Sequence, residues 1–222
     1  METLQRTANR GSISTGPYQI DYSVCWEPNL TDQAYRSQGS TAGTRTKQTF
    51  SVWLKRTELG GDQYIFEGGT GNANDTQFGI QFSNSNKIQV MRGHTSGGFQ
   101  YLLNTNRVFR DTSAWMHIVV AVDTTLGTAD NRVRLYVNGV EETSFSNRNN
   151  PSQNDVKGTN FGKQAIGYNT IDNNSGFNGY MCEVVIQDGV ASAPTEFGEF
   201  DSDSGIWVPK DASGATTVSY TH

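Results

Sequence analysis

Two loops of this sequence concentrate the side-chain oxygen atoms that hold metal ions. The segments GGTGNANDTQ at 68–77 and NTIDNNSG at 169–176 are rich in Asn and Asp. Calcium takes such hard oxygen ligands at about 2.3 to 2.6 Å. The competing interpretation is turn chemistry, because tight loops also require Asn, Asp and Gly. Neither segment contains the DxDxDG pattern of an EF-hand, so neither predicts a metal site without further support.

A second group of residues combines aromatic rings with planar amides, the groups that recognise sugars. A ring stacks on a pyranose face, and an amide reads the hydroxyls. His94, Phe99 and Tyr101 flank the Gly-rich loop RGHTSGGFQ, while Tyr168 and Asn169 stand at the mouth of the second Asn-rich loop. We take these five as candidate ligand-binding residues. Each aromatic equally suits packing in the core or against a loop, so the structural interpretation stays open beside the functional one.

Nucleophilic catalysis and zinc binding find little support. The three histidines lie in different settings: His94 in the Gly-rich loop, His222 near the C-terminus, and His117 inside a strand pattern beside Trp115 and Val119. We expect His117 to be a half-buried, hydrogen-bonded strand residue, since nothing marks a nucleophile held beside it. The same scarcity of histidine argues against a zinc cluster. No catalytic residue is therefore predicted.

The two cysteines both fall on segments that predict strands. Cys25 and Cys182 would meet if those strands were neighbours, but a small buried residue also fits both positions. No oxidising export route is visible in the sequence. We therefore expect two free, buried thiols rather than a disulfide.

The segment 115–142 shows what kind of scaffold positions these side chains. Apolar residues recur at every second position on both sides of a polar loop at 123–131, which predicts two strands with one core face each. The alternating residues are Met116, Ile118, Val120, Val122, Val133, Leu135 and Val137. Asn138-Gly139 then predicts a tight turn. A hairpin of this kind needs a second apolar surface, which the rest of the chain must supply.

Composition indicates the fold class and excludes several functions. With 24 Gly, 34% hydrophobic residues and no long helical period, the 222 residues predict one all-β sandwich or barrel with minimal helix. The formal charge of -5 and the pI near 5.2, with scattered Lys and Arg, argue against nucleic-acid binding. No apolar run approaches the roughly 20 residues that span a bilayer. The N-terminal METLQRTANRGSISTG lacks the apolar region of a signal peptide.

The chain divides into three parts by pattern. Residues 1–17 are mostly polar and predict an N-terminal arm, residues 18–210 predict the sandwich, and residues 211–222 predict a tail. Within the sandwich, a first strand is expected over 18–26 and a long surface loop over 142–159. A closing segment near the end is expected to tuck four apolar side chains against the sandwich. These are Phe197, Phe200, Ile206 and Trp207.

Several of these segments resemble one family. The motifs are TFSVWLKR at 49–56, AWMHIVVAVDTT at 114–125, RVRLYVNGVE at 132–141, FNGYMCEVVIQDG at 177–189 and PTEFGEFDSDSGIWVPK at 194–210. They resemble the successive strands of laminin-G-like jelly-roll domains of the concanavalin A-like lectin and glucanase superfamily. More narrowly, they resemble the version found in structural proteins of tailed bacteriophages and related environmental viruses. The resemblance covers about residues 18–210 and implies a sandwich of two curved antiparallel sheets.

The resemblance also implies a site and a chemistry. Related laminin-G domains hold a rim calcium with an acidic residue just before a strand and a second ligand from a later loop. Asp75, with Asp172 or Asn174, lies in loosely matching places, so the two Asn-rich loops are expected to meet at one rim. Glucanases of the superfamily use a Glu-x-Asp-x-x-Glu strand. Here Glu199-Phe200-Asp201-Ser202-Asp203 lacks the second Glu and lies in the closing segment, which predicts a solvated acidic turn and no enzyme.

Two functional interpretations follow, with a glycoside hydrolase as a minor third. The first is a non-enzymatic virion surface protein that binds glycans or a host cell-surface receptor, as a phage receptor-binding, adhesion or fibre domain. The second is a capsid-decorating or fibre protein whose sandwich mainly contacts other virion subunits. Both place the protein on the virion, without nucleic acid or membrane insertion, and both are compatible with a homo-oligomer. Calcium is the one cofactor that the resemblance implies.

Overall fold

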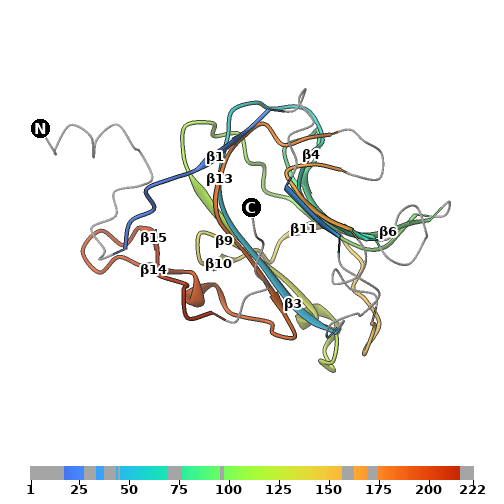
Figure 1. Cartoon of the computed structure of the whole chain (residues 1–222). Helices are drawn as coiled ribbons and strands as arrows, with labels where there is room; N and C mark the ends of the chain where they lie inside the picture. Colours follow the sequence, from blue (N-terminus) through green and yellow to red (C-terminus); the bar gives the residue numbers. More distant parts are fainter. Residues whose placement is uncertain are drawn as a thin grey trace, which may run out of the picture.

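The computed structural model describes residues 18–27, 34–37, 44, 46–69, 77–95, 98–156, 163–169 and 175–215, and gives the backbone alone for 36–37, 93–95 and 98–102. These residues form two large antiparallel sheets packed face to face (Figure 1). The helical segments among them are two single turns of 3-10 helix, η1 (Ala129–Asn131) and η2 (Pro194–Glu196). No helix in the described ranges is long and apolar enough to span a membrane. The predicted two-sheet antiparallel sandwich with minimal helix is confirmed.

Each large sheet has its own strand order. The six-stranded sheet runs β1-β13-β3-β8-β9-β10 and the seven-stranded sheet β11-β7-β6-β5-β4-β12-β2. The six strands are β1 (Val24–Trp26), β13 (Gly179–Asp188), β3 (Lys47–Arg56), β8 (Met116–Asp123), β9 (Val133–Val137) and β10 (Val140–Glu141). The seven are β11 (Phe145–Arg148), β7 (Gly98–Thr105), β6 (Ile88–Thr95), β5 (Phe78–Phe82), β4 (Gln63–Gly69), β12 (Lys163–Ile166) and β2 (Ala34–Ser37). A small third sheet pairs β14 (Gly198–Phe200) with β15 (Trp207–Pro209).

The hairpin of β8 and β9 lies as the sequence predicts. Val120 of β8 is the Cα partner of Leu135 of β9, and both side chains are buried in the core. Asn138 and Gly139 have φ angles of 50° and 77°, so both adopt the left-handed conformation that a tight hairpin turn requires. The neighbour of β8 on its other side is β3, which makes β8 a central strand.

The core fills the space between the two sheets with aliphatic and aromatic side chains. Each sheet contributes alternate residues, because successive side chains of a strand point to opposite faces. The six-stranded sheet supplies Phe50, Val52, Leu54, Met116, Ile118, Val120, Val122, Val133, Leu135, Val137, Met181 and Ile186. The seven-stranded sheet supplies Ile65, Phe66, Phe78, Ile80, Phe82, Ile88, Val90, Leu103 and Ile166. Every position at which a core face was predicted in β8 and β9 is buried.

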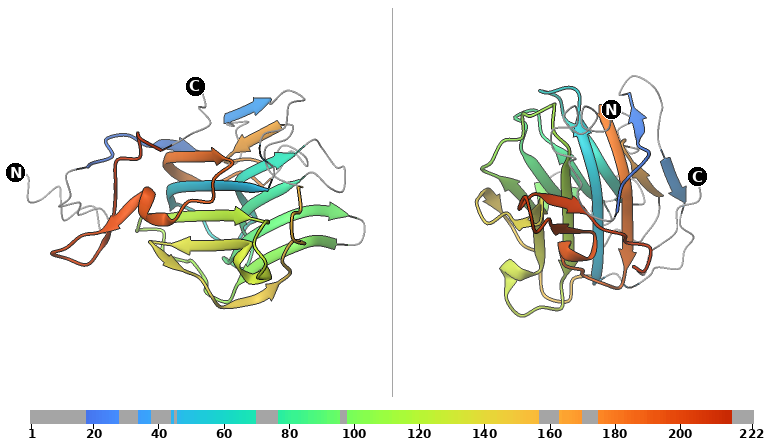
Figure 2. Two further views of the ribbon diagram at one scale, coloured as in Figure 1. Left: turned by 90° about the horizontal axis from the view of Figure 1, so that it is seen from below. Right: turned by 90° about the vertical axis from the view of Figure 1, so that its left-hand side faces the viewer.

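The segment after β13 forms a third layer over the outer face of the six-stranded sheet (Figure 2, right). Thr49 of β3 fastens its start: Thr49 Oγ1 donates to Val190 O at 2.8 Å and accepts from Ser192 N at 2.8 Å. Further along, Trp207 and Phe197 are 5% and 3% exposed. This layer explains why β8 is buried on both faces.

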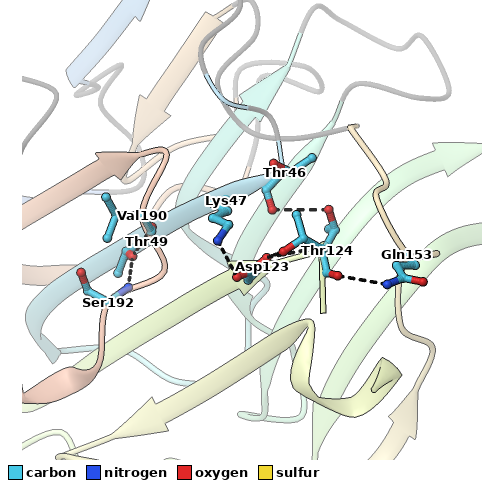
Figure 3. Close-up of polar contacts among 9 residues, drawn as sticks. Thr46, Lys47, Thr49, Asp123, Thr124, Gln153, Val190 and Ser192 are labelled. Carbon is cyan, nitrogen blue, oxygen red and sulfur yellow. Dashed lines mark hydrogen bonds and ion pairs between the residues drawn. The ribbon is translucent and has the colours of Figure 1, made fainter. Parts of the chain in front are cut away.

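Polar contacts gather at the end of the sandwich where β3 begins and β8 ends, and Figure 3 shows those of Lys47 with Asp123 and of Thr46 with Thr124. Lys47 Nζ pairs with Asp123 Oδ2 at 3.1 Å. Thr124 Oγ1 donates to Asp155 O at 2.7 Å, and Asp155 Oδ2 pairs with Nη1 of the buried Arg92 of β6 at 2.5 Å. Burial alone would raise the pKa of Asp123, but hydrogen bonds from Thr125 and Lys47 outweigh it and lower that pKa. These contacts fix one end of the sandwich.

Three detailed expectations are wrong. The predicted surface loop at 142–159 contains the edge strand β11. The mostly polar sequence of this segment does not indicate a strand. Phe200 and Ile206 are 54% and 40% exposed, because they lie on the small β14–β15 hairpin and not under it. Both thiols are free, as predicted, but Cys25 is exposed and Cys182 is partly exposed. Cys25 lies on β1, which is an edge strand.

Candidate functional site

The sequence-predicted ligand residues fall into two groups. His94 and Phe99 are Cα partners across the β6–β7 hairpin, and Tyr101 pairs with Arg92 on the same two strands. Tyr168 and Asn169 follow β12 and are 9% and 1% exposed. The side chains of the first group, like the calcium candidates Asp75, Asp172 and Asn174, lie outside the described residues.

The described anchors of the two Asn-rich loops stand at opposite ends of β4. The first loop leaves the sheet after Gly69, the last residue of that strand. The second is anchored where Ser175 O accepts a hydrogen bond from Tyr64 N at 2.9 Å, near the start of the strand. The length of β4 between them is about 20 Å at 3.3 Å per residue. The meeting of these loops at one rim stays a prediction. The described residues between the two anchors belong to the seven-stranded sheet.

A row of amide side chains crosses the outer face of the seven-stranded sheet. Gln81 of β5 is the Cα partner of Gln89 of β6, Gln89 pairs with Asn104 of β7, and Asn104 pairs with Asn147 of β11. Tyr64 of β4 pairs with Gln81 and flanks the row. We call Gln81, Gln89, Asn104 and Asn147 the amide row. Gln81, Gln89 and Asn104 alternate along their strands with core residues, so they lie on the face that points away from the core, and Asn147 shares that face as the partner of Asn104.

Two amide oxygens of the row lack a hydrogen-bond donor within the described part of the chain. Gln81 Nε2 donates to Gln89 Oε1 at 2.7 Å, which leaves Gln81 Oε1 without a donor, and Asn104 Oδ1 is in the same state. Gln81 is 6% exposed. Leaving a buried acceptor unsatisfied costs about 1 to 3 kcal/mol. Such atoms in a folded protein are usually satisfied by water or by a ligand.

An apolar surface adjoins the amide row. Gly79 of β5 has no side chain, and Met91 Cε and Tyr64 Cε1 lie 3.1 and 3.2 Å from the place where a Cβ atom would stand. The Tyr64 ring and the Met91 thioether therefore lie over this glycine. Glu67, the Cα partner of Gly79, is 1% exposed and accepts a hydrogen bond from Gln77 Nε2 at 2.7 Å. The ring and the thioether are packed beside the amide row, with Tyr64 8% and Met91 5% exposed.

The sequence does not single out these residues, because binding groups are expected in loops and these lie on strands. FGIQF, KIQV and LLNT show ordinary alternation, in which a polar residue on a strand is the expected solvent face. The signal that was present is the residue type, since Gln81, Gln89 and Asn104 are all amides. Only the register of the strands shows that they form one row.

A family model of laminin G domains, described as the concanavalin A-like lectin/glucanases superfamily, matches residues 30–195. The chain belongs to this superfamily. A search of curated proteins by sequence found no match. The predicted jelly-roll class is confirmed by the family match together with the two packed antiparallel sheets.

Solved structures share the fold of this concanavalin A-like domain at low sequence identity. The mouse laminin alpha1 chain, domains LG4-5, gives a TM-score of 0.54 at 12% identity, covering 74% of this chain and 41% of that one. A SAP-like pentraxin from Limulus polyphemus gives 0.50 at 14%, covering 74% of each chain. A provisionally named carbohydrate-binding protein from Bacteroides ovatus gives 0.50 at 16%, covering 78% of this chain and 46% of that one. The chain thus spans less than half the length of the first and third structures, and the fold is one that carbohydrate-binding proteins share at a coarse level.

His117 of this concanavalin A-like domain lies in a buried contact with Ser51. His117 Nε2 lies 2.8 Å from Ser51 Oγ, and Trp207 Nε1 donates to His117 Nδ1 at 3.0 Å. Because an indole N–H only donates, Nδ1 must accept, so Nε2 carries the proton and donates to Ser51. Both His117 and Ser51 are 1% exposed. The predicted hydrogen-bonded strand histidine is confirmed, with deeper burial than expected. The pair is buried, and no acidic side chain among the described residues is bonded to it.

The acidic turn of the closing segment stabilises its own backbone. Asp201 Oδ1 accepts hydrogen bonds from Asp203 N at 3.2 Å and Ser204 N at 2.7 Å. Glu199 and Asp203 are exposed on the β14–β15 hairpin. No group of three or more His, Cys, Asp or Glu side chains placed to hold a metal occurs among the described residues.

Proposed function

We propose that this protein is a non-enzymatic glycan-binding module whose binding surface is the outer face of the seven-stranded sheet. The observation that carries the proposal is the pair of unsatisfied oxygens, Gln81 Oε1 and Asn104 Oδ1, in one row of amides beside Tyr64. Sugar hydroxyls are donors that satisfy such oxygens. The shared fold of carbohydrate-binding proteins supports the proposal at the coarse level.

Unsatisfied buried atoms also occur elsewhere in the described chain, so a single such atom does not identify a binding surface. Gln187 Oε1 and Trp53 Nε1 on the six-stranded sheet are two of them. The amide row differs because two acceptors share a face with aligned amides in register. Gln187 therefore serves as a matched control: it is 3% exposed, but it belongs to the other sheet.

The chemistry of the amide row favours binding over hydrolysis. Glycoside hydrolysis uses two carboxyl groups about 5 to 9.5 Å apart, one of which gives or takes a proton. Amides do neither at neutral pH. The described carboxyl group nearest the row in register is Glu67, which is buried and bonded to Gln77. We therefore propose no enzymatic activity.

The proposed setting is the surface of a virion, where the partner is a host cell-surface glycan. This placement rests on the resemblance of TFSVWLKR and PTEFGEFDSDSGIWVPK to structural proteins of tailed phages. A second candidate is a structural role in which the sandwich mainly contacts other virion subunits. It is favoured by the β14–β15 hairpin, whose tip projects past the sheets and which exposes Phe200 and Ile206 (Figure 1). Light scattering of the wild type and of Phe200→Ser with Ile206→Ser tests it, since a subunit contact through this hairpin predicts loss of an oligomer.

We propose separately that Asp75, with Asp172 or Asn174, binds calcium. If the ion supports binding, a chelator abolishes glycan binding, and Asp75→Ala with Asp172→Ala has the same effect. If binding survives both, calcium is not needed.

A glycan array with and without chelator is the first experiment, followed by titration of the best ligand. Gln81→Met and Asn104→Leu remove the unsatisfied oxygens, and Gln81→Met also removes the hydrogen bond from Gln81 Nε2 to Gln89 Oε1. Each should weaken binding by about tenfold, which corresponds to about 1.4 kcal/mol. Gln187→Met should leave binding unchanged. Equal effects of Gln81→Met and Gln187→Met would place the binding surface elsewhere.

A further inference from the structure

The C-terminal layer, residues 190–210, lies over the outer face of the six-stranded sheet and has backbone hydrogen bonds of its own (Figure 2, right). Within the layer, β14 pairs with β15, and Lys210 N donates to Phe197 O at 3.1 Å. The start of the layer is fastened to β3 by the two hydrogen bonds of Thr49. Because its pairing is internal, the layer can leave the sheet as a unit.

A second attachment, near the middle of the layer, depends on one nitrogen atom of His117. Trp207 Nε1 donates to His117 Nδ1 at 3.0 Å, and His117 Nε2 lies 2.8 Å from Ser51 Oγ. An indole N–H can only donate, so Nδ1 has to be unprotonated for this bond to form. A proton on Nδ1 would set two N–H donors against each other and break the attachment.

The groups around the His117 ring are uncharged. Ser51 and Trp53 of β3 and Phe197 and Trp207 of the layer contact it. The Trp53 ring, 4.7 Å away, attracts a cation weakly, but burial disfavours the charge and lowers the pKa of His117 to about 3. None of the ionisable groups on the neighbouring elements is bonded to the ring within the described chain. They are Asp123 of β8, Lys55 of β3, Arg134 and Tyr136 of β9, Glu141 of β10, and Glu196, Glu199, Asp201, Asp203 and Lys210 of the layer.

We propose that acid releases the C-terminal layer from the six-stranded sheet before the sandwich itself unfolds. When the layer leaves, the His117 ring reaches water, takes up a proton on Nδ1 and can no longer accept from Trp207. Release uncovers the outer face of β8, which is buried while the layer is in place. This face belongs to the sheet opposite the proposed glycan-binding surface, so release does not require glycan binding.

The pH range of release follows from the two states of His117. In the released chain the ring is in water and has its ordinary pKa of 6.5, whereas in the attached chain the pKa is lower. The attachment is therefore complete above about pH 6.5 and weakens as the pH falls toward 3. Over this range each pH unit raises the ratio of released to attached chains about tenfold, which is about hundredfold between pH 6.5 and 4.5.

Hydrogen exchange measured by NMR tests the proposal. The indole N–H of Trp207 reports the attachment, and the backbone amides of the central strand β8 report opening of the core. Protection is the exchange rate of an unfolded peptide divided by that of the protein. The protection of the Trp207 indole should fall about hundredfold between pH 6.5 and 4.5. At pH 4.5 it should be at least about tenfold lower than that of the β8 amides, because release precedes unfolding.

Two variants separate the titration of His117 from other effects of acid. His117→Asn keeps an acceptor for Trp207 and does not titrate, so its indole protection should be nearly equal at the two pH values. Thr49→Val removes the hydrogen bonds of the first attachment and leaves His117 in place. Its indole protection should be lower than that of the wild type at both pH values and should still fall about hundredfold.

Three results would overturn the proposal. Equal protection of the Trp207 indole and the β8 amides at pH 4.5 would show that the layer leaves only when the sandwich unfolds. A hundredfold fall that persists in His117→Asn would show that acid acts on another group. Indole protection that is constant with pH in the wild type would show that no release occurs. The first and third results come from the wild type alone, so they decide even if His117→Asn does not fold.

Discussion

Acid should lower the free energy of unfolding of this protein through one buried histidine, His117. Burial lowers the pKa of His117 from 6.5 to about 3. In the folded chain its Nδ1 accepts from Trp207 Nε1, and its ring stacks on Trp53 at 4.7 Å between centroids. Protonation of Nδ1 removes that acceptor and places a charge between two indole rings. The C-terminal layer is thus held by an atom that must stay unprotonated.

The sign and size follow from linkage. The folded pKa lies below the unfolded one, so as the pH falls the unfolded chain takes up this proton first. The contribution of His117 is fully present above about pH 6.5 and is lost as the pH falls toward 3. At pH 4.5, two units below the unfolded pKa, the loss is about 3 kcal/mol at roughly 1.4 kcal/mol per unit. A domain with a total stability of about 5 to 15 kcal/mol feels a loss of this size.

His117→Asn isolates the effect, because its amide oxygen can replace Nδ1 as the acceptor for Trp207 and does not titrate. Urea unfolding of both proteins at pH 7.5 and 4.5 gives four free energies. The wild type should lose about 3 kcal/mol more than the variant between the two pH values, since other titrating groups are common to both. Equal losses would refute the argument that burial of a neutral His117 makes stability depend on pH.

Other substitutions test the fold, the thiols and the absence of catalysis. Leu135→Asp should abolish cooperative unfolding, because the substitution removes about 2 to 5 kcal/mol of packing and buries a carboxyl group in place of a fully buried leucine. Val140→Asp, at a 59% exposed position, should melt like the wild type. Circular dichroism measures both melts. Maleimide at pH 8 should label the exposed Cys25 much faster than Cys182, whose thiol pKa is raised by burial and by Glu183 to about 12; equal rates would contradict this. No β-glucan hydrolysis is expected, and reducing-sugar release that Glu199→Gln removed would show that the acidic turn is catalytic.

The fold was predictable because its signals are local. Alternation in 116–122 and 133–137 identified the central hairpin and its core face, and Asn138-Gly139 identified the turn. β11 was missed because it has four residues of which only Phe145 is apolar, too few to show alternation. The exposure of Phe200 and Ile206 was missed because sequence shows that a residue is apolar, but not whether anything lies over it.

The candidate site was less predictable because register creates it. The amide row joins residues from β5, β6, β7 and β11, and no spacing along the chain reveals which of them become neighbours. The metal site was predicted in two loops because Asn and Asp concentrate there, but turn chemistry produces the same composition. A strand amide, in contrast, looks like ordinary solvent-facing polarity until its partners are known.

The two outer faces of the sandwich differ in a way that supports placing function on one of them. On the six-stranded sheet, Trp207 fits against Gly139 and Gly198, where any Cβ atom would overlap its ring, and it bonds to His117. The C-terminal layer thus occupies that face with a close and specific fit. On the seven-stranded sheet, amide oxygens of Gln81 and Asn104 remain without donors in the described chain. A binding partner that supplies donors gains most where buried acceptors lack them.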